Sequence, residues 1–266
     1  TYPPGSTFKL ITLLEYIREN PDTWQDFHYT CTGTYTNGDY VVNCHDGVAH
    51  GELDIYGILG MSCNGAFDTI AQTLNSTKWQ KLAEDFGYNQ SDRSQVDFAY
   101  KKSHFDIASD DSVWSRMQLA IGQGTTTVTP LLNLMMYAAI ANDGVMMTPY
   151  LVDHYLDANG NVVEQTKPKA LRSVCTKAEA ELMDEFLTYV ITNGTAAAGG
   201  SQYARVSGKT GSAQYDSTKN YHAWFCGYGT NDVSEIAVCV MIEKGGAGGI
   251  VAAPVAGQIF DYYFSR

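Results

Sequence analysis

The segment from residue 6 to residue 17 constrains the fold more than any other, because it leaves almost no polar face for water. Its apolar residues recur at helical spacing on nearly every side, so it is predicted to be a helix buried at the centre of the protein. They are Phe8, Leu10, Ile11, Leu13, Leu14 and Ile17. Residues 3–5, Pro-Pro-Gly, stiffen the approach to the helix start. The chain is therefore expected to fold around its own beginning, with Lys9 as an unusual charge inside it.

Length and charge limit the remaining possibilities. The 266 residues are enough for one large domain with a buried core. The formal net charge of −12 argues against nucleic acid as a partner, because a phosphate backbone binds basic surfaces. No run approaches the roughly 18 apolar residues that a membrane span needs. Without an internal repeat or linker, residues 1–266 are predicted to form one domain.

Helices are predicted early in the chain and strands late. Two helices are expected between Asp54 and Gly87, with a break at the sequence MSCNG, and an apolar helix begins at Thr129 and Pro130. Three strand-like runs follow near the C-terminus and are expected to form an antiparallel meander. They are ARVSGKTGSAQ, YHAWFCGYGT and EIAVCVMIE, and a last helix is expected over VAAPVAGQIFDYYF.

Residues 176–192 are predicted to be a helix with a capping box, and residues 150–173 a short β-ribbon that turns at Asn159–Gly160. Residues 21–51 and 88–115 are expected to be rich in loops. The predicted class is α+β, an antiparallel sheet flanked by helices with an all-helical subregion.

Three short motifs occur in a fixed order along this pattern. They are Ser6-Thr7-Phe8-Lys9, Ser62-Cys63-Asn64 at the break between helices, and Lys209-Thr210-Gly211 on a strand, followed by Ser212. Taken singly, each motif is more simply a helix cap, a turn or a loop tip. Taken together, they form the SxxK, SxN and KTG set of β-lactamases and penicillin-binding proteins.

The motif residues are suited to acyl transfer. A serine hydroxyl needs a base beside it, and Lys9 lies three residues after Ser6 on one face of the helix, within hydrogen-bonding reach. Burial, the helix N-terminus and the second cation Lys209 are expected to lower the pKa of Lys9, so that it can accept the Ser6 proton. Ser62 is predicted to relay that proton to the leaving amine, and the backbone N–H groups of Ser6 and Ser212 to form the oxyanion hole.

The remaining motif residues are predicted to bind substrate. The Asn64 amide can hold the peptide bond of the acyl donor. Lys209, Thr210 and Ser212 can bind a substrate carboxylate through charge and hydroxyl donors. Gly211, like Gly208 before it, is expected to let the strand approach the substrate backbone closely.

Cys31 and Cys44 lie in a polar loop rich in glycine and tyrosine. A disulfide between them and two free thiols are both compatible with the sequence. A metal site that includes His45 and His50 is the least favoured alternative, because these spacings match no standard zinc pattern. No metal ligand is therefore predicted.

Beyond the three motifs, the sequence resembles the transpeptidase domain of class B penicillin-binding proteins over nearly its whole length. The Gln-containing turn at residues 122–124 is then structural, since it does not complete a phosphate-binding GxGxxG. The resembling segments are YPPGSTFK, HGELDIYGILGMSCN, AIGQGTTTVTPLLNLMMYAAIANDGVMMTPYLV, SGKTGSAQ with HAWFCGY, and AAPVAGQIFDYYF.

The resemblance implies a β-lactamase/transpeptidase-like fold and an enzyme that cross-links peptidoglycan without a cofactor. Ser6 would attack the D-Ala–D-Ala end of a stem peptide, release D-alanine and pass the acyl group to an amine on a neighbouring strand. β-Lactams would acylate the same serine. The resemblance also implies a membrane-anchored protein on the extracytoplasmic face of the bacterial membrane, with a glycosyltransferase as a possible partner.

One departure from the family concerns the start of the chain. Only five residues precede Ser6, so the chain is expected to lack the N-terminal strands of the domain, the stem domain and the membrane anchor. The C-terminal sheet is then expected to expose an edge.

Three alternative functions share the acylation chemistry. A class A β-lactamase would carry an ExxxN pattern after SxN, whereas Glu84 and Asn89 are five residues apart. A D,D-carboxypeptidase would pass the acyl group to water. A sensor of β-lactams or muropeptides would be acylated once and signal through a region outside this chain.

Overall fold

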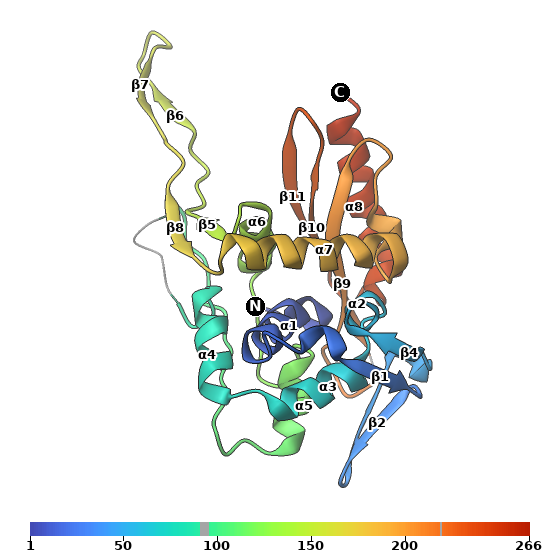
Figure 1. The fold of residues 1–266 in the computed structure, drawn as a ribbon. Coiled ribbons are helices and arrows are strands. Elements are labelled where there is room, and N and C mark those ends of the chain that lie inside the picture. The colour runs from blue at the N-terminus through green and yellow to red at the C-terminus, as the bar shows by residue number, and fades with distance from the viewer. Residues whose placement is uncertain (91–95, 219) are drawn as a thin grey trace.

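A computed structural model of the protein describes residues 1–90, 96–218 and 220–266. The chain opens with the 3₁₀ turn η1 (Gly5–Phe8), which continues directly into α1 (Lys9–Glu19). Leu10, Leu13 and Leu14 of α1 have no exposed surface, and the helix lies at the centre of the molecule (Figure 1). The predicted central helix is confirmed, with its first turn wound more tightly than an α-helix.

The three predicted C-terminal strands form an antiparallel sheet. They are β9 (Arg205–Gln214), β10 (Tyr221–Thr230) and β11 (Glu235–Ile242), in the order β11-β10-β9. Cys226 in the centre of β10 pairs with Lys209 of β9 on one side and with Cys239 of β11 on the other. The middle strand is almost entirely buried, because helices cover both faces of the sheet.

Helix α8 (Gly248–Phe264) packs on one face of the sheet, and α6 (Pro130–Ala141) and α7 (Lys177–Asn193) pack on the other (Figure 1). On the α8 side, the ring of Phe260 meets Phe225 edge to face at 6.2 Å. The predicted caps of both other helices are present, with Thr129 bonded to the Leu132 amide and a full capping box at the start of α7.

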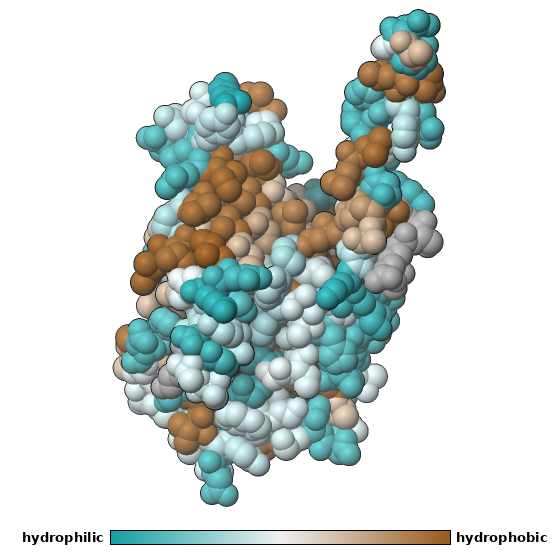
Figure 2. All heavy atoms as spheres, turned by 180° about the vertical axis from the view of Figure 1, so that it is seen from behind, coloured by the Kyte–Doolittle hydropathy of each residue, from teal (hydrophilic) through white to brown (hydrophobic). Residues whose placement is uncertain are grey.

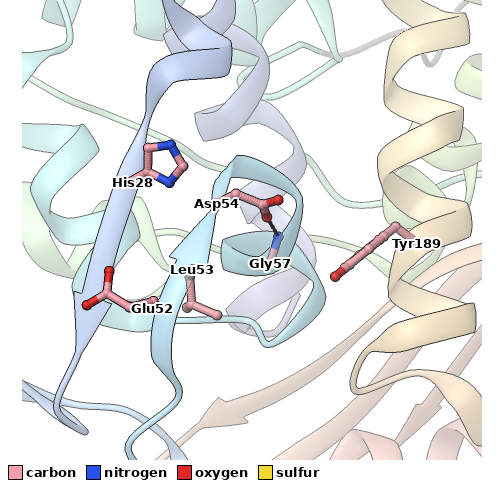
Figure 3. Close-up of a pocket in the computed structure, with 6 residues that line it drawn as sticks. All are labelled: His28, Glu52, Leu53, Asp54, Gly57 and Tyr189. Atoms are coloured by element: carbon pink, nitrogen blue, oxygen red, sulfur yellow. Dashed lines mark hydrogen bonds between the residues drawn. The ribbon is translucent and has the colours of Figure 1, made fainter.

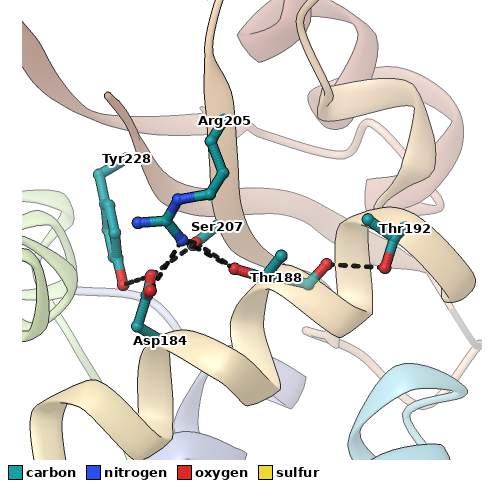
Figure 4. Close-up of polar contacts among 6 residues, drawn as sticks. All are labelled: Asp184, Thr188, Thr192, Arg205, Ser207 and Tyr228. Carbon is teal, nitrogen blue, oxygen red and sulfur yellow. Dashed lines mark hydrogen bonds and ion pairs between the residues drawn. The ribbon is translucent and has the colours of Figure 1, made fainter. Parts of the chain in front are cut away.

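A polar network joins α7 to the strand that carries the third motif (Figure 4). The Asp184 carboxylate accepts hydrogen bonds from the Ser207 and Tyr228 hydroxyls and from the Arg205 guanidinium, each at 2.7 Å. The Thr188 hydroxyl lies 2.8 Å from the Ser207 hydroxyl. These bonds fix β9 against the helix, so the third motif is held by more than its strand pairing.

The helical subregion lies beside α1. It contains α2 (Ile55–Gly60), α3 (Asn64–Thr73), α4 (Ser76–Asp85) and α5 (Val113–Ala120). The predicted break between helices is confirmed at residues 61–63. Helix α5 was not predicted, because its eight residues are short and carry a single cap, Ser112. Residues 91–95 of the stretch expected to be irregular lie outside the described residues.

Short strands and turns form the periphery, including residues 21–51, which the sequence predicts to be rich in loops. The predicted ribbon with its turn at Asn159–Gly160 is confirmed and projects from the body (Figure 1). The pairs are β1 (His28–Cys31) with β4 (Gly51–Asp54), β2 (Thr34–Asn37) with β3 (Tyr40–Asn43), β5 (Val145–Met147) with β8 (Ala170–Ser173), and β6 (His154–Leu156) with β7 (Val162–Gln165). Among the described residues, further 3₁₀ turns are η2 (Trp24–Asp26), η3 (His45–Gly47) and η5 (Ala197–Gly199).

Within the described part of the chain, β11 pairs with no strand on its outer side. Figure 2 shows apolar side chains gathered over α8 and this edge of the sheet. The exposed members on α8 include Ile250, Val255, Ile259, Tyr262 and Tyr263. The expected open edge is therefore present. No helix in the described ranges is both long and apolar enough to cross a membrane.

Candidate active site

The backbone around Ser6 is held in place by close contacts with two distant segments. Gly5 has a left-handed φ of +56°, and a Cβ there would lie 3.0 Å from the Cβ of Ala213 on β9. The Gly5 amide donates to the Gly122 carbonyl at 2.9 Å. Gly122 has a φ of +69°, and a Cβ there would lie 2.3 Å from the Gly5 carbonyl oxygen. The predicted structural role of residues 122–124 is confirmed.

The residues after Ser6 are anchored in the core. The Thr7 carbonyl accepts from the Tyr137 hydroxyl at 2.9 Å, and the Thr7 hydroxyl accepts from the Asn133 amide at 3.1 Å. The Phe8 ring stacks on Phe105 at 4.9 Å. The half-buried Ser6 hydroxyl itself has no hydrogen-bond partner within the described residues, so the predicted nucleophile is an unengaged hydroxyl on a fixed backbone.

Lys9 joins the first motif to the second. Its side chain is fully buried, and its Nζ donates to Asn64 Oδ1 at 2.7 Å, to the Ser62 carbonyl at 2.8 Å and to Ser62 Oγ at 3.3 Å. An ammonium group has three donors, and these three contacts account for them. The predicted hydrogen bond between Lys9 and Ser6 is therefore absent in this state, because the second motif supplies the acceptors.

Burial lowers the pKa of Lys9 to about 8. Charges on Cys63, Cys44 and Asp68 oppose this shift. Both carboxylate oxygens of Asp68 are buried without a hydrogen-bond partner in the described structure, and burial raises the pKa of that carboxyl well above its usual range. This supports the prediction that the pKa of Lys9 is lowered toward neutral pH, and burial is the main cause of the shift.

The second motif is strained at its serine. Ser62 has a φ of +54°, which only a few non-glycine residues adopt and which costs about 1 to 3 kcal/mol. Backbone bonds from Ser62 to Leu59 and from Cys63 to Ile58, at 3.1 and 2.9 Å, hold this turn. The Asn64 amide nitrogen donates to the Asn43 carbonyl at 2.8 Å. The strain is concentrated where the sequence predicts a catalytic hydroxyl.

Lys209, in the third motif, is as deeply buried as Lys9. Burial lowers its pKa well below the usual value, and the charge of Lys9 lowers it further. The expected converse effect, in which Lys209 lowers the pKa of Lys9, is not among the causes of the Lys9 shift. Lys209 Nζ donates to the Thr210 carbonyl at 3.0 Å.

The predicted substrate-binding hydroxyls have partners within the protein. Thr210 Oγ1 lies 3.0 Å from Thr195 Oγ1, and Ser212 Oγ accepts from the Gly248 amide at 3.0 Å. Thr195 was not predicted from the sequence, since it lies outside all three motifs. A substrate carboxylate would therefore have to share these hydroxyls with the protein.

The two glycines of β9 are packed closely against other parts of the protein. A Cβ on Gly211 would lie 2.9 Å from the Pro4 carbonyl oxygen, so this glycine lets the strand approach the nucleophile segment. A Cβ on Gly208 would lie 2.7 Å from the Phe225 ring. Protein atoms occupy the space beside both glycines, and the expectation that they let the strand approach the substrate backbone stays a prediction.

Cys31 and Cys44 lie close together but are not bonded. Their sulfur atoms are 3.6 Å apart, and both are free thiols, so the structure has the free-thiol alternative. Two further ligating residues, His50 and Cys63, lie beside them. The sequence favours a metal site at Cys31, Cys44 and His50 least and does not point to Cys63, because Cys63 stands inside the second motif and has no predicted role of its own.

A surface pocket of about 330 Å³ lies between β1, β4, α2 and α7 (Figure 3). It contains none of the three motifs, so the candidate site is the motif cluster and not this pocket. Its lining residues are His28, Glu52, Leu53, Asp54, Gly57 and Tyr189.

The fold is an antiparallel sheet between helices, and its centre holds a free serine hydroxyl with a buried lysine one turn away. The SxN and KTG residues lie around this pair. Together these features define an active-site serine protein of the SxxK class. The chain belongs to the penicillin binding protein transpeptidase domain family, whose family model matches residues 1–261.

Similar proteins agree with this assignment. The chain is 28% identical to stage V sporulation protein D of Bacillus subtilis, over 97% of this chain and 41% of that protein. It is 26% identical to peptidoglycan D,D-transpeptidase PbpA of Mycolicibacterium smegmatis, over 96% of this chain and 53% of that protein. The chain thus spans about half the length of these curated relatives. The solved D,D-transpeptidase domain of a peptidoglycan glycosyltransferase from Eggerthella lenta superimposes with a TM-score of 0.85 at 29% identity, covering 97% of this chain and 64% of that one.

Proposed function

We propose that the protein is a peptidoglycan D,D-transpeptidase that acts through an acyl-enzyme on Ser6 and is acylated by β-lactams. The observation that carries the proposal is the buried Lys9, one turn after a free serine and hydrogen-bonded to both polar residues of the second motif. A family model for penicillin-binding transpeptidase domains and relatives named as D,D-transpeptidases support the same reaction.

Acylation begins with neutral Lys9. Ser6 Oγ forms a bond to the carbonyl carbon of the penultimate D-alanine, and the Ser6 proton passes to Lys9 Nζ. The carbonyl oxygen becomes an oxyanion, which the backbone N–H groups of Ser6 and Ser212 would stabilise. The fixed backbone on both sides of Ser6 holds the nucleophile in position for this attack.

Expulsion of D-alanine completes acylation. The carbon–nitrogen bond breaks, and the leaving amine takes a proton from the Ser62 hydroxyl, which regains one from Lys9 over the 3.3 Å contact between them. In the transfer step, an acceptor amine attacks the carbonyl carbon of the Ser6 ester and gives its proton to Ser62 and Lys9. The ester bond breaks, and Ser6 Oγ takes that proton back as the new amide is released. The strained turn at Ser62 suits a hydroxyl that exchanges protons in both halves.

The third motif would bind the terminal carboxylate of the donor. A carboxylate beside Lys209 would raise the pKa of that buried amine and so favour its charged form. Thr210 and Ser212 would add hydroxyl donors, and Asn64 would hold the donor's peptide bond after exchanging its bond to Lys9. The extracytoplasmic face of the membrane, and a glycosyltransferase partner that makes the glycan strands, fit this substrate.

A β-lactamase is the less supported alternative. Glu84 accepts a hydrogen bond from Gln80 at 2.9 Å, and the Asn89 amide donates to the Phe105 carbonyl. Neither side chain contacts the motif residues, so neither is in place to activate a hydrolytic water.

The transfer step distinguishes transpeptidation from hydrolysis. We expect a thioester donor that carries an N-acylated D-alanine to give an amide product with a D-amino acid acceptor, in an amount that rises with acceptor concentration. The product is measured by mass spectrometry, with Ser6→Ala as the control that should give none. Hydrolysis alone, at a rate independent of the acceptor, would identify a carboxypeptidase instead.

A further inference from the structure

Three cysteines and one histidine converge beside the second motif. Cys31 comes from β1, Cys44 follows β3, His50 precedes β4, and Cys63 is the middle residue of the second motif. Their ligating atoms all lie within 4.8 Å of one another. The three cysteines are buried and the histidine is partly buried.

Three of the six distances among the four ligating atoms match those of a tetrahedral metal site. With Zn–S bonds of about 2.3 Å and Zn–N bonds of about 2.0 Å, a tetrahedron places sulfurs about 3.8 Å apart and sulfur and nitrogen about 3.5 Å apart. The Sγ atoms of Cys31 and Cys44 are 3.6 Å apart, and those of Cys44 and Cys63 are 3.8 Å apart. Cys31 Sγ lies 3.4 Å from His50 Nδ1.

We propose that Cys31, Cys44, His50 and Cys63 together bind one Zn²⁺ or a similar thiophilic divalent ion. Three thiolates and one imidazole are a standard ligand set for structural zinc. A disulfide between Cys31 and Cys44 would use two of the four groups and leave Cys63 and His50 without a role. One ion with tetrahedral coordination uses all four.

The surroundings of the sulfurs suit a thiolate–metal site. Cys63 is the N-cap residue of α3, and the free backbone N–H groups of the first helical turn favour negative charge beside them.

The ion would join the β1–β4 region to the turn that bears Ser62 and Asn64. It is therefore a structural site that holds the strained second motif in place, and it takes no direct part in acyl transfer. This consequence for catalysis rests on the proposed function, whereas metal binding itself does not.

Metal content tests the site directly. We expect the reduced chain, equilibrated with Zn²⁺ and passed through gel filtration, to retain about one equivalent by elemental mass spectrometry. Loss of a residue that only hydrogen-bonds to a metal ligand weakens metal binding roughly 10- to 100-fold. His50→Ala and Cys44→Ser remove ligands themselves and should weaken zinc binding by more than this. Cys175→Ser, which removes a buried thiol outside the cluster, should retain the full equivalent.

Co²⁺ substitution adds a test that does not depend on how the variants fold. The wild-type protein loaded with Co²⁺ should show thiolate charge-transfer absorption and the visible bands of tetrahedral Co²⁺. Wild-type protein that retains no zinc, or zinc retained equally by His50→Ala, would overturn the proposal. So would a native mass lower by two hydrogens, from a Cys31–Cys44 disulfide, in protein purified with reductant.

The effect on the active site has a separate readout. A chelator should slow acylation by benzylpenicillin, and added Zn²⁺ should restore the rate. If an ion is shown to bind but its removal does not change the acylation rate, the claim that the ion holds Ser62 in place would be wrong, and the metal site itself would stand. Absence of acylation in zinc-loaded protein would count against the proposed function and leave the metal site standing.

Discussion

Replacing Lys9 by methionine should lower the rate of acylation by benzylpenicillin about a thousandfold, because general base catalysis contributes roughly 10²- to 10⁴-fold and Lys9 is the proposed base for Ser6. Methionine has a similar length and no charge, so the buried site can accommodate it. The rate is measured by intact-mass kinetics, with near-ultraviolet circular dichroism to confirm the native fold.

The pH dependence of the acylation rate gives a second test of Lys9 as the base. With the pKa of Lys9 lowered to about 8, the neutral base becomes scarcer below that pH. The wild-type acylation rate should rise about tenfold per pH unit toward pH 8 and then level off. Burial lowers the pKa of Lys9, and charges on Cys63, Cys44 and Asp68 oppose that shift, so these groups set the pH at which the rate levels off.

Lys81→Met is the matched control, since Lys81 is an exposed lysine on α4 paired with Asp85. It should acylate at the wild-type rate with the wild-type pH profile. A Lys9→Met variant that acylates within tenfold of the wild type, with its fold intact, would rule out Lys9 as the base.

Replacing Gly122 by alanine should lower the free energy of unfolding by about 3 to 5 kcal/mol and slow acylation. A left-handed φ alone costs a non-glycine residue about 1 to 2 kcal/mol. The added Cβ would also lie 2.3 Å from the Gly5 carbonyl and 2.8 Å from Phe8 Cβ. The backbone on one side of Ser6 must therefore move. Urea unfolding and penicillin acylation measure the two effects.

Gly38→Ala separates backbone strain from this contact. Gly38 has a φ of +60°, and a Cβ there would have no atom within 4 Å. It should cost only about 1 to 2 kcal/mol and leave acylation unchanged. Equal losses in the two variants would mean that Gly122 does not position the nucleophile.

The sequence was informative wherever a short-range rule decides the structure. Ser6 and Lys9 share a helix turn, so their spacing indicates chemistry directly. The capping box of Thr176 and Glu179 and the three-stranded meander also follow from local patterns, and all are present. Family resemblance added the order of the motifs and the expected open edge of the sheet.

Long-range contacts were beyond the same reasoning. That Lys9 binds Ser62 and Asn64, 53 and 55 residues away, depends on how two helices meet, which no local spacing encodes. The space beside Gly211 is filled by the Pro4 carbonyl, again from a distant segment. The cysteine cluster draws on four separate segments, so its ligand spacing fits no standard pattern although its geometry fits a metal.

The central claim is that Ser6 forms the acyl-enzyme, and intact mass spectrometry after incubation with benzylpenicillin tests it most directly. We predict one stable adduct per chain on the wild type, located on Ser6 by peptide mapping, and none on Ser6→Ala. An adduct that survives in Ser6→Ala, or a natively folded wild-type protein that forms no adduct, would contradict the account.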